Sequence, residues 1–192
     1  ETGGYELGVA LDVLSPTESA LMYLAEAMDQ YHRTFDVYTD LGAAGNHFVH
    51  RETMVSDGDF SKVAFDDGYY DSPYSGDTCI ELCFDAEGLN WAGQYFMNGV
   101  FQGNPPQLGP NWGTYPDAGI DLSGSTELTF WARGAAGGEW VEFFAFGVGR
   151  DATSGQPIEP YPDSSAKVST GYITLSDSWK HYRIQLGRRD LR

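Results

Sequence analysis

Aromatic rings and planar polar side chains gather between residues 91 and 133 in a pattern typical of sugar recognition. A pyranose ring has an apolar C–H face that stacks on a flat aromatic ring, and its hydroxyls need hydrogen-bonding groups nearby. The candidate residues are Trp91, Tyr95, Trp112, Tyr115, Trp131 and Arg133. Trp91 and Tyr95 share a face if their stretch is a strand. The alternatives are that Trp91 and Tyr95 pack in a core and that Trp112 and Tyr115 anchor a loop.

Carboxylates in glycine-containing turns form a second candidate site, this time for a metal. Calcium takes about six to eight oxygen ligands, many of them carboxylates and carbonyls in such turns. The candidate ligands are Asp57, Asp59, Asp66, Asp67 and Asp71, and a further turn is framed by Asp36, Asp40 and Asn46. The spacing does not fit an EF-hand. The alternative is a solvated acidic surface, which is common in acidic proteins.

Catalysis is not indicated by any motif. The sequence lacks the G-x-S-x-G, H-E-x-x-H and P-loop patterns, and its four histidines are scattered. Pairs of carboxylates occur by chance among 28 acidic residues, so they do not point to a glycosidase. We therefore expect a protein that is not an enzyme.

The net charge of the protein limits the classes of partner that it can bind. The formal net charge is −17, which disfavours nucleic acid and anionic membranes. No apolar run approaches the roughly 18–20 residues of a membrane-spanning helix. Cys79 and Cys83 would lie about 13 Å apart on one strand, too far for a disulfide, and they read as buried thiols.

Short strands separated by turns must position these residues. The 24 glycines and 9 prolines favour a mainly β domain. Residues 120–149 read as two strands joined by a glycine-rich turn, a hairpin in which Trp140 belongs to the core, as does Trp179 further on. We also expect strands within 35–49, at 78–84, 89–97 and 171–186, and a long loop at 103–119.

The N-terminal stretch, residues 1–33, reads as a separate arm preceding a domain at 34–192. Residues 5–14 alternate as a strand, and a capping box with Pro16 at the first helical position begins an amphipathic helix over 16–32. The apolar stripe of this helix packs either on its own domain or on a neighbouring subunit, in which case the chain forms a homo-oligomer.

Three phrases of the sequence carry a likeness to a known family: DLSGSTELTFWARG, WVEFF and TGYITLSDSWKHYRIQLGRRDL. They resemble galactose-binding-like jelly-roll sandwiches, which include non-catalytic carbohydrate-binding modules of secreted microbial proteins. The likeness covers roughly residues 35–191. It implies an antiparallel jelly-roll β-sandwich that is secreted or surface-exposed, binds a polysaccharide or other glycan, and holds a structural calcium ion.

Two departures from the family pattern lead to an alternative function. The arm lies outside the likeness, and such domains usually have one more strand after the phrase GRRDL. The strand at 5–14 is a candidate to fill that place, from the same chain or from a neighbour. The alternative is therefore a structural or assembly subunit, of filament or surface-layer type, whose arms exchange between subunits.

Overall fold

The computed structural model describes residues 34–47, 50–85, 91–97, 99–112, 115, 120–147, 149, 151, 153–154, 156–158 and 165–187. The chain divides into two compact units, Glu1–Phe35 and Asp36–Arg192. The predicted strand at 5–14 and helix at 16–32 lie outside the described residues, so the arm and its exchange between subunits stay predictions.

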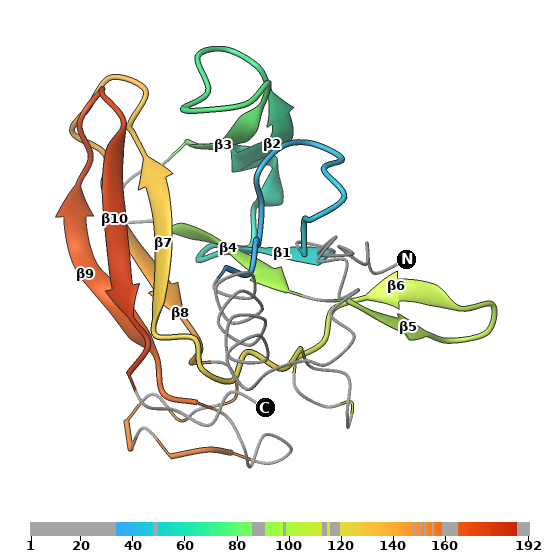
Figure 1. Ribbon diagram of the computed structural model, residues 1–192. Helices are drawn as coiled ribbons and strands as arrows, with labels where there is room; N and C mark the ends of the chain where they lie inside the picture. Colours follow the sequence, from blue (N-terminus) through green and yellow to red (C-terminus); the bar gives the residue numbers. More distant parts are fainter. Residues whose placement is uncertain are drawn as a thin grey trace, which may run out of the picture. The chain divides into compact units, whose positions relative to one another are not determined.

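The second unit is mainly β, with antiparallel pairing throughout its described strands, as expected of a β-sandwich (Figure 1). The strands are β1 (His50–Val55), β2 (Val63–Tyr69), β3 (Cys79–Phe84), β4 (Ala92–Met97), β5 (Val100–Gln102), β6 (Gln107–Gly109), β7 (Glu127–Ala132), β8 (Trp140–Ala145), β9 (Val168–Thr174) and β10 (Lys180–Gln185). Helical structure among the described residues is limited to the 3-10 turn η1 (Phe60–Lys62). No helix in this part of the chain is long and apolar enough to cross a membrane.

Strands β1 to β4 form one long two-stranded ribbon that folds at a corner. β1 pairs with β4 and β2 pairs with β3, in a register that continues from one pair to the other. Backbone hydrogen bonds carry the ladder around the corner, from Ser56 N–H to the Trp91 carbonyl (2.9 Å) and from Asp85 N–H to the Lys62 carbonyl (3.0 Å). The chain reverses between β2 and β3, so the ribbon has one closed end.

Strands β7 to β10 form a second folded ribbon. β7 pairs with β10 and β8 pairs with β9, so β7 and β8 follow one another along the same side of the ribbon. The corner lies at Gly134–Glu139, where Gly134 N–H bonds to the Ser176 carbonyl and Leu175 N–H bonds to the Glu139 carbonyl, both at 2.8 Å. Gly137 and Gly138 have φ of 79° and 101°, which L-residues rarely adopt. The strands predicted within 120–149 are confirmed, but the predicted hairpin pairing is wrong, because the glycine-rich stretch makes a corner.

Folding the second ribbon brings the inner faces of its two halves together, with β8 passing behind β7 in Figure 1. Phe130 of β7 lies 4.6 Å from Phe143 of β8 and 5.7 Å from Tyr182 of β10, between ring centroids. The buried hydrophobic side chains of the described residues, Leu175, Ile184 and Leu186, belong to the same region. The period-2 pattern thus selects the core face correctly, since Phe130 and Tyr182 are paired positions on that face.

Four other expectations need correction. Residues 36–47 form turns without a strand, and a chain reversal inside the predicted long loop allows β6 to pair with β5. Cys79 and Cys83 both lie on β3 as free thiols, but Cys83 is exposed. Trp140 is 69 % exposed, so its assignment to the core is wrong.

Candidate functional site

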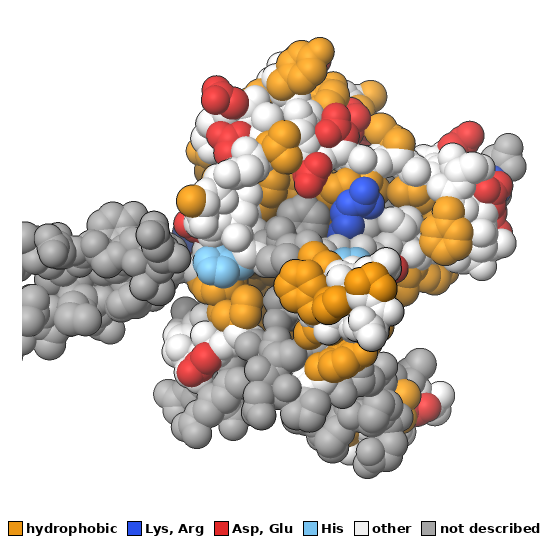
Figure 2. Space-filling model, turned by 90° about the vertical axis from the view of Figure 1, so that its right-hand side faces the viewer, with side chains coloured by type: hydrophobic (Ala, Val, Ile, Leu, Met, Phe, Trp, Pro, Cys, Tyr) orange, Lys and Arg blue, Asp and Glu red, His pale blue; other side chains and the backbone are white. Residues whose placement is uncertain are grey.

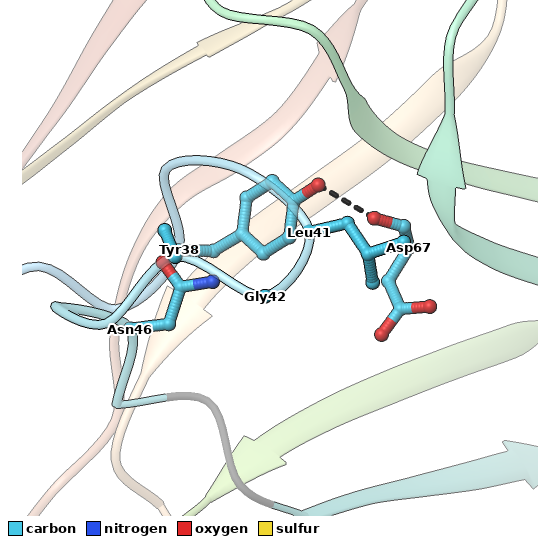
Figure 3. Close-up of a pocket in the computed structure, with 6 residues that line it drawn as sticks. Tyr38, Leu41, Gly42, Asn46 and Asp67 are labelled. Carbon is cyan, nitrogen blue, oxygen red and sulfur yellow. Dashed lines mark hydrogen bonds between the residues drawn. The ribbon is translucent and has the colours of Figure 1, made fainter.

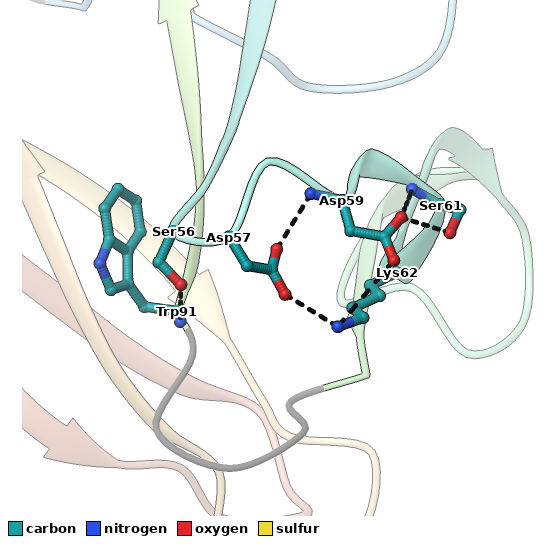
Figure 4. Close-up of polar contacts among 6 residues, drawn as sticks. All are labelled: Ser56, Asp57, Asp59, Ser61, Lys62 and Trp91. Atoms are coloured by element: carbon teal, nitrogen blue, oxygen red, sulfur yellow. Dashed lines mark hydrogen bonds and ion pairs between the residues drawn. The ribbon is translucent and has the colours of Figure 1, made fainter.

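The acidic residues at the first corner serve the local structure (Figure 4). The Lys62 ammonium lies 2.8 Å from Asp57 Oδ2, and this hydrogen bond is the main reason that the pKa of Asp57 is lowered. Asp59 caps η1, where its Oδ1 accepts hydrogen bonds from the Ser61 backbone N–H (3.1 Å) and hydroxyl (2.6 Å). These carboxylate oxygens therefore already have hydrogen-bond donors, which a metal ion would have to displace.

The remaining predicted metal ligands also take part in hydrogen bonds within the protein. Asp66 Oδ1 accepts from Gly68 N–H at 2.8 Å, Asp71 Oδ1 accepts from the Ser72 hydroxyl at 3.0 Å, and the Asp67 carbonyl accepts from the Tyr38 hydroxyl at 2.6 Å. Within the described part of the chain, no three His, Cys, Asp or Glu residues form a group that could hold a metal ion. The structure does not bring the five aspartates together, and calcium stays a prediction.

Asp40 joins two loops that are far apart in the sequence. Its carboxylate accepts hydrogen bonds from the backbone N–H groups of Asp77 (2.9 Å) and Thr78 (2.6 Å) and from the Thr78 hydroxyl. The Thr78 hydroxyl is the main reason that the pKa of Asp40 is lowered. A larger residue in place of Gly76 would collide with this carboxylate, because its Cβ would lie 2.2 Å from Asp40 Oδ2. Asp40 was expected as a candidate ligand, and the structure shows it as an anchor of the 36–47 loop.

A pocket of about 260 Å³ lies beside this anchor (Figure 3). It is lined by Tyr38, Leu41, Gly42, Ala43, Asn46 and Asp67. The Asn46 side chain holds the loop itself, because its Oδ1 accepts from Thr39 N–H (2.8 Å) and its Nδ2 donates to the Asp40 carbonyl (2.6 Å). With its polar side chains engaged in this way, the pocket offers few groups for a ligand.

The predicted sugar-binding residues fall into separate places. Tyr95 of β4 meets Trp112 edge to face, with ring centroids 5.6 Å apart, and burial raises the pKa of its hydroxyl. Trp91 is 54 % exposed, and its backbone N–H donates to the Ser56 hydroxyl at 3.0 Å. Tyr115 is exposed in the loop that follows Trp112. Tyr95 and Trp112 are therefore in contact. Trp91 differs from Tyr95 in that it is exposed, whereas Tyr95 is half-buried.

Trp131 and Arg133 lie on the outer face of β7 and β10. Tyr74, from the loop between β2 and β3, stacks on Trp131 with centroids 3.8 Å apart and an interplanar angle of 13°. The cross-strand partner His181 contacts the same indole, with ring centroids 5.0 Å apart. The Arg133 guanidinium lies 5.4 Å from the centre of the Trp179 ring, so Trp179 also belongs to this outer cluster.

Exposure alone does not select a site, because hydrophobic side chains are exposed at many places, as Figure 2 shows for one face. A surface on which a sugar can stack is better identified by a pair of aromatic rings that fix each other's orientation. Trp140 of β8 and Tyr172 of β9 stack with centroids 4.2 Å apart and an interplanar angle of 24°. They are 69 % and 62 % exposed. No other pair of stacked rings in the described residues combines such contact with such exposure.

The stacked pair belongs to a continuous surface, here called the β8 face, which comprises Trp140, Glu142, Phe144, Lys167 and Tyr172. Trp140 and Glu142 alternate onto one side of β8. The pairing with β9 shifts register between Glu142 and Phe144, and the Phe144 ring contacts Tyr95 and Lys167, whereas Phe143 faces the core. The Lys167 ammonium lies 3.0 Å from Glu142 Oε2. A hydrogen bond from Ser169 and then Lys167 lower the pKa of Glu142, so this carboxylate stays ionised at neutral pH.

Phe144 connects the β8 face to the pair of rings formed by Tyr95 and Trp112. Its ring lies 5.2 Å from that of Tyr95, which in turn contacts Trp112. Four residues of strand, about 13 Å, separate Trp140 from Phe144. The β8 face is therefore open at Trp140 and covered by Tyr95 at Phe144, with a charged pair between the two ends.

No family model, curated protein or solved structure matches this chain. The function is therefore inferred from the chemistry of the surface.

Sequence reasoning missed Trp140 and Tyr172, although a signal was present. Trp140 alternates with Glu142, and a carboxylate two residues along a strand indicates a solvated face. Tyr172 could be placed beside it only once β8 was known to pair with β9.

Proposed function

We propose that this domain binds a polysaccharide without transforming it, and that the β8 face is its binding surface. The exposed stacked pair of Trp140 and Tyr172 carries the proposal. Each ring keeps one face free for the apolar side of a sugar, and stacking fixes both rings before the ligand arrives. Ring immobilisation of this kind lowers the entropy lost on binding.

The polar groups beside the rings suit the hydroxyls of a sugar. The half-exposed Lys167 ammonium, which both oxygens of Glu142 hold at 3.0 Å, supplies a donor directly next to the stacked pair along β8. The two exposed rings, Trp140 and Tyr172, offer more than one ring face to a sugar, so a chain-like glycan fits this surface better than a single monosaccharide.

The finer assignments of fold and location belong to the same proposal. A jelly-roll sandwich of the galactose-binding-like kind is supported by the three sequence phrases and by two ribbons that each fold over at a corner. Such domains occur in secreted proteins, which is why we place this domain outside the cell or on its surface.

The binding surface is tested by a tryptophan substitution with a matched control. A sugar that covers about 80 Å² of Trp140 gains roughly 2 kcal/mol from apolar burial, so Trp140→Ala should weaken binding about 30-fold. Trp91→Ala removes another exposed indole, which is not one of the residues of the β8 face, and should leave affinity unchanged. Affinity electrophoresis and calorimetry on a panel of soluble neutral polysaccharides give the measurement.

Two outcomes would contradict the proposal. If the unaltered chain binds no polysaccharide in the panel, the carbohydrate-binding function is wrong. If Trp91→Ala weakens binding and Trp140→Ala does not, the domain binds sugar but through another surface.

A further inference from the structure

A second surface of this domain combines cationic and aromatic side chains, although the protein as a whole is acidic. The outer face of β7 and β10, here called the β10 face, carries Glu127, Thr129, Trp131, Arg133, Trp179, His181, Arg183 and Gln185. Trp131 pairs with His181, and Thr129 pairs with Arg183, so these side chains lie beside one another on the strands. The face is separate from the β8 face, because the inner sides of β7 and β8 meet at Phe130 and Phe143.

The strands of the β10 face carry two arginines, Arg133 and Arg183, and one carboxylate, Glu127, although the chain has 28 acidic residues against 11 Lys and Arg. Glu81 and Asp71 act together with Arg133 on the pKa of Tyr69, so Arg133 has acidic neighbours and Arg183 is the cation that an anion from solution can reach. Glu127 is shared, since Gln185 Nε2 donates to its Oε2 at 2.9 Å and Arg183 Nη1 lies 3.8 Å from its Oε1. The Arg183 side chain is 60 % exposed, and a pair at 3.8 Å in water is weak. Its guanidinium remains accessible to an anion from solution.

Aromatic rings lie next to these charges. Tyr74 stacked on Trp131 gives an exposed aromatic edge, with 47 % and 40 % of the two residues accessible. The exposed hydroxyl of Thr129 and the amide of Gln185 complete a row of hydrogen-bonding groups along the strands. Rings, hydroxyl, amide and guanidinium in one row suit a sugar that also carries an anionic group.

We propose that the β10 face binds an acidic polysaccharide, whose carboxylate or sulfate group is held by the Arg183 guanidinium. A guanidinium binds either group through two parallel N–H···O hydrogen bonds. At physiological salt the screening length is about 8 Å, so an anionic group beside Arg183 responds mainly to charges within that distance. The inference shares with the proposed function only the idea that the ligand is a polysaccharide.

The test compares two substitutions that change the net charge equally. Arg183→Gln removes the guanidinium from the β10 face, whereas Lys180→Gln removes an exposed cation on the same strand, at a position that alternates onto the other side. Binding to polygalacturonate (carboxylate), dextran sulfate (sulfate) and dextran (neutral) is measured by calorimetry at 50 and 150 mM salt. We expect Arg183→Gln to weaken acidic-polymer binding about tenfold, Lys180→Gln to have little effect, and affinity to fall with salt.

The outcomes separate this inference from the proposed function. A loss on only one of the two acidic polymers identifies the anionic group. Equal losses for both variants mean non-specific attraction and overturn the inference, as does failure of the unaltered chain to prefer acidic polymers over dextran. Binding to neutral polysaccharides that depends on Trp140 and not on Arg183 would leave the proposed function standing alone.

Discussion

A designed disulfide across β7 and β10 tests the folded ribbon directly. Thr129 and Arg183 are exposed cross-strand partners, so their Cα atoms lie about 4.5–5.5 Å apart, within the range that a disulfide spans. In a simple hairpin of β7 with β8, these two positions would not be neighbours. The variant Thr129→Cys with Arg183→Cys should therefore oxidise readily and form one intramolecular bond.

The size of the expected effect follows from the loop that the bond closes. The loop from 129 to 183 has about 55 residues, and the entropy lost by the unfolded chain on closing it corresponds to about 4 kcal/mol at 25 °C. Strain in the native ribbon reduces this gain, so the oxidised variant should be about 2–4 kcal/mol more stable than the reduced one. Chemical denaturation with and without reductant measures the difference.

The control uses a pair that the ribbon keeps apart. Thr129→Cys with Lys180→Cys places the second thiol three residues along β10, at a position that alternates onto the other side. Peptide mapping distinguishes the new bond from any that involves the free Cys79 or Cys83. If the first pair fails to oxidise, or the control pair oxidises equally well, the pairing of β7 with β10 is wrong.

Other perturbations test the core, the loop anchor and the corner. Ile184→Ala removes a side chain that is 2 % exposed and should lower the free energy of unfolding by about 2–4 kcal/mol. Arg183→Ala at the neighbouring position should lower it by less than about 0.5 kcal/mol. Equal losses would contradict the assignment of the inner face. The pKa of Asp40 is lower in the folded chain, so its stabilising effect is complete above the unfolded pKa and is lost as pH falls through the folded one. Denaturation midpoints should therefore fall as the pH drops below about 4, less steeply in Asp40→Asn, and parallel curves would refute the anchor. Gly134→Ala should destabilise the corner, because its Cβ would lie 1.8 Å from Glu139 Oε2, and an unchanged melting temperature would show that the carboxylate moves away freely.

The positions of most strands could be predicted because alternation is a local property. The alternation of Leu128 and Phe130 predicts the inner face of β7 from a few residues, and the structure confirms this prediction. Pairing is not local. Whether β7 bonds to β8 or to β10 depends on contacts between residues about 50 positions apart, so a glycine-rich link between strands reads equally well as a hairpin turn or as a corner.

The candidate site was harder to predict for the same reason. Trp140 belongs to a strand with aromatic rings on both sides, and such a pattern indicates burial on both sides. The structure shows that Tyr95 covers that side of the strand at Phe144 and leaves it open at Trp140. How far one ribbon extends over another is set by loop lengths and corners, which single-strand patterns do not report.

The folded ribbon also makes the two proposed surfaces independent of each other. The inner sides of β7 and β8 meet through Phe130 and Phe143, so the β8 face and the β10 face point away from a shared core. Residues that share no partner contribute to free energies additively. Combining Trp140→Ala with Arg183→Gln should therefore multiply the two losses for a polymer that touches both faces, while each loss stays unchanged for a ligand that touches one. A double variant that loses no more than Trp140→Ala alone, on an acidic polymer sensitive to both single substitutions, would show that the faces act as one site.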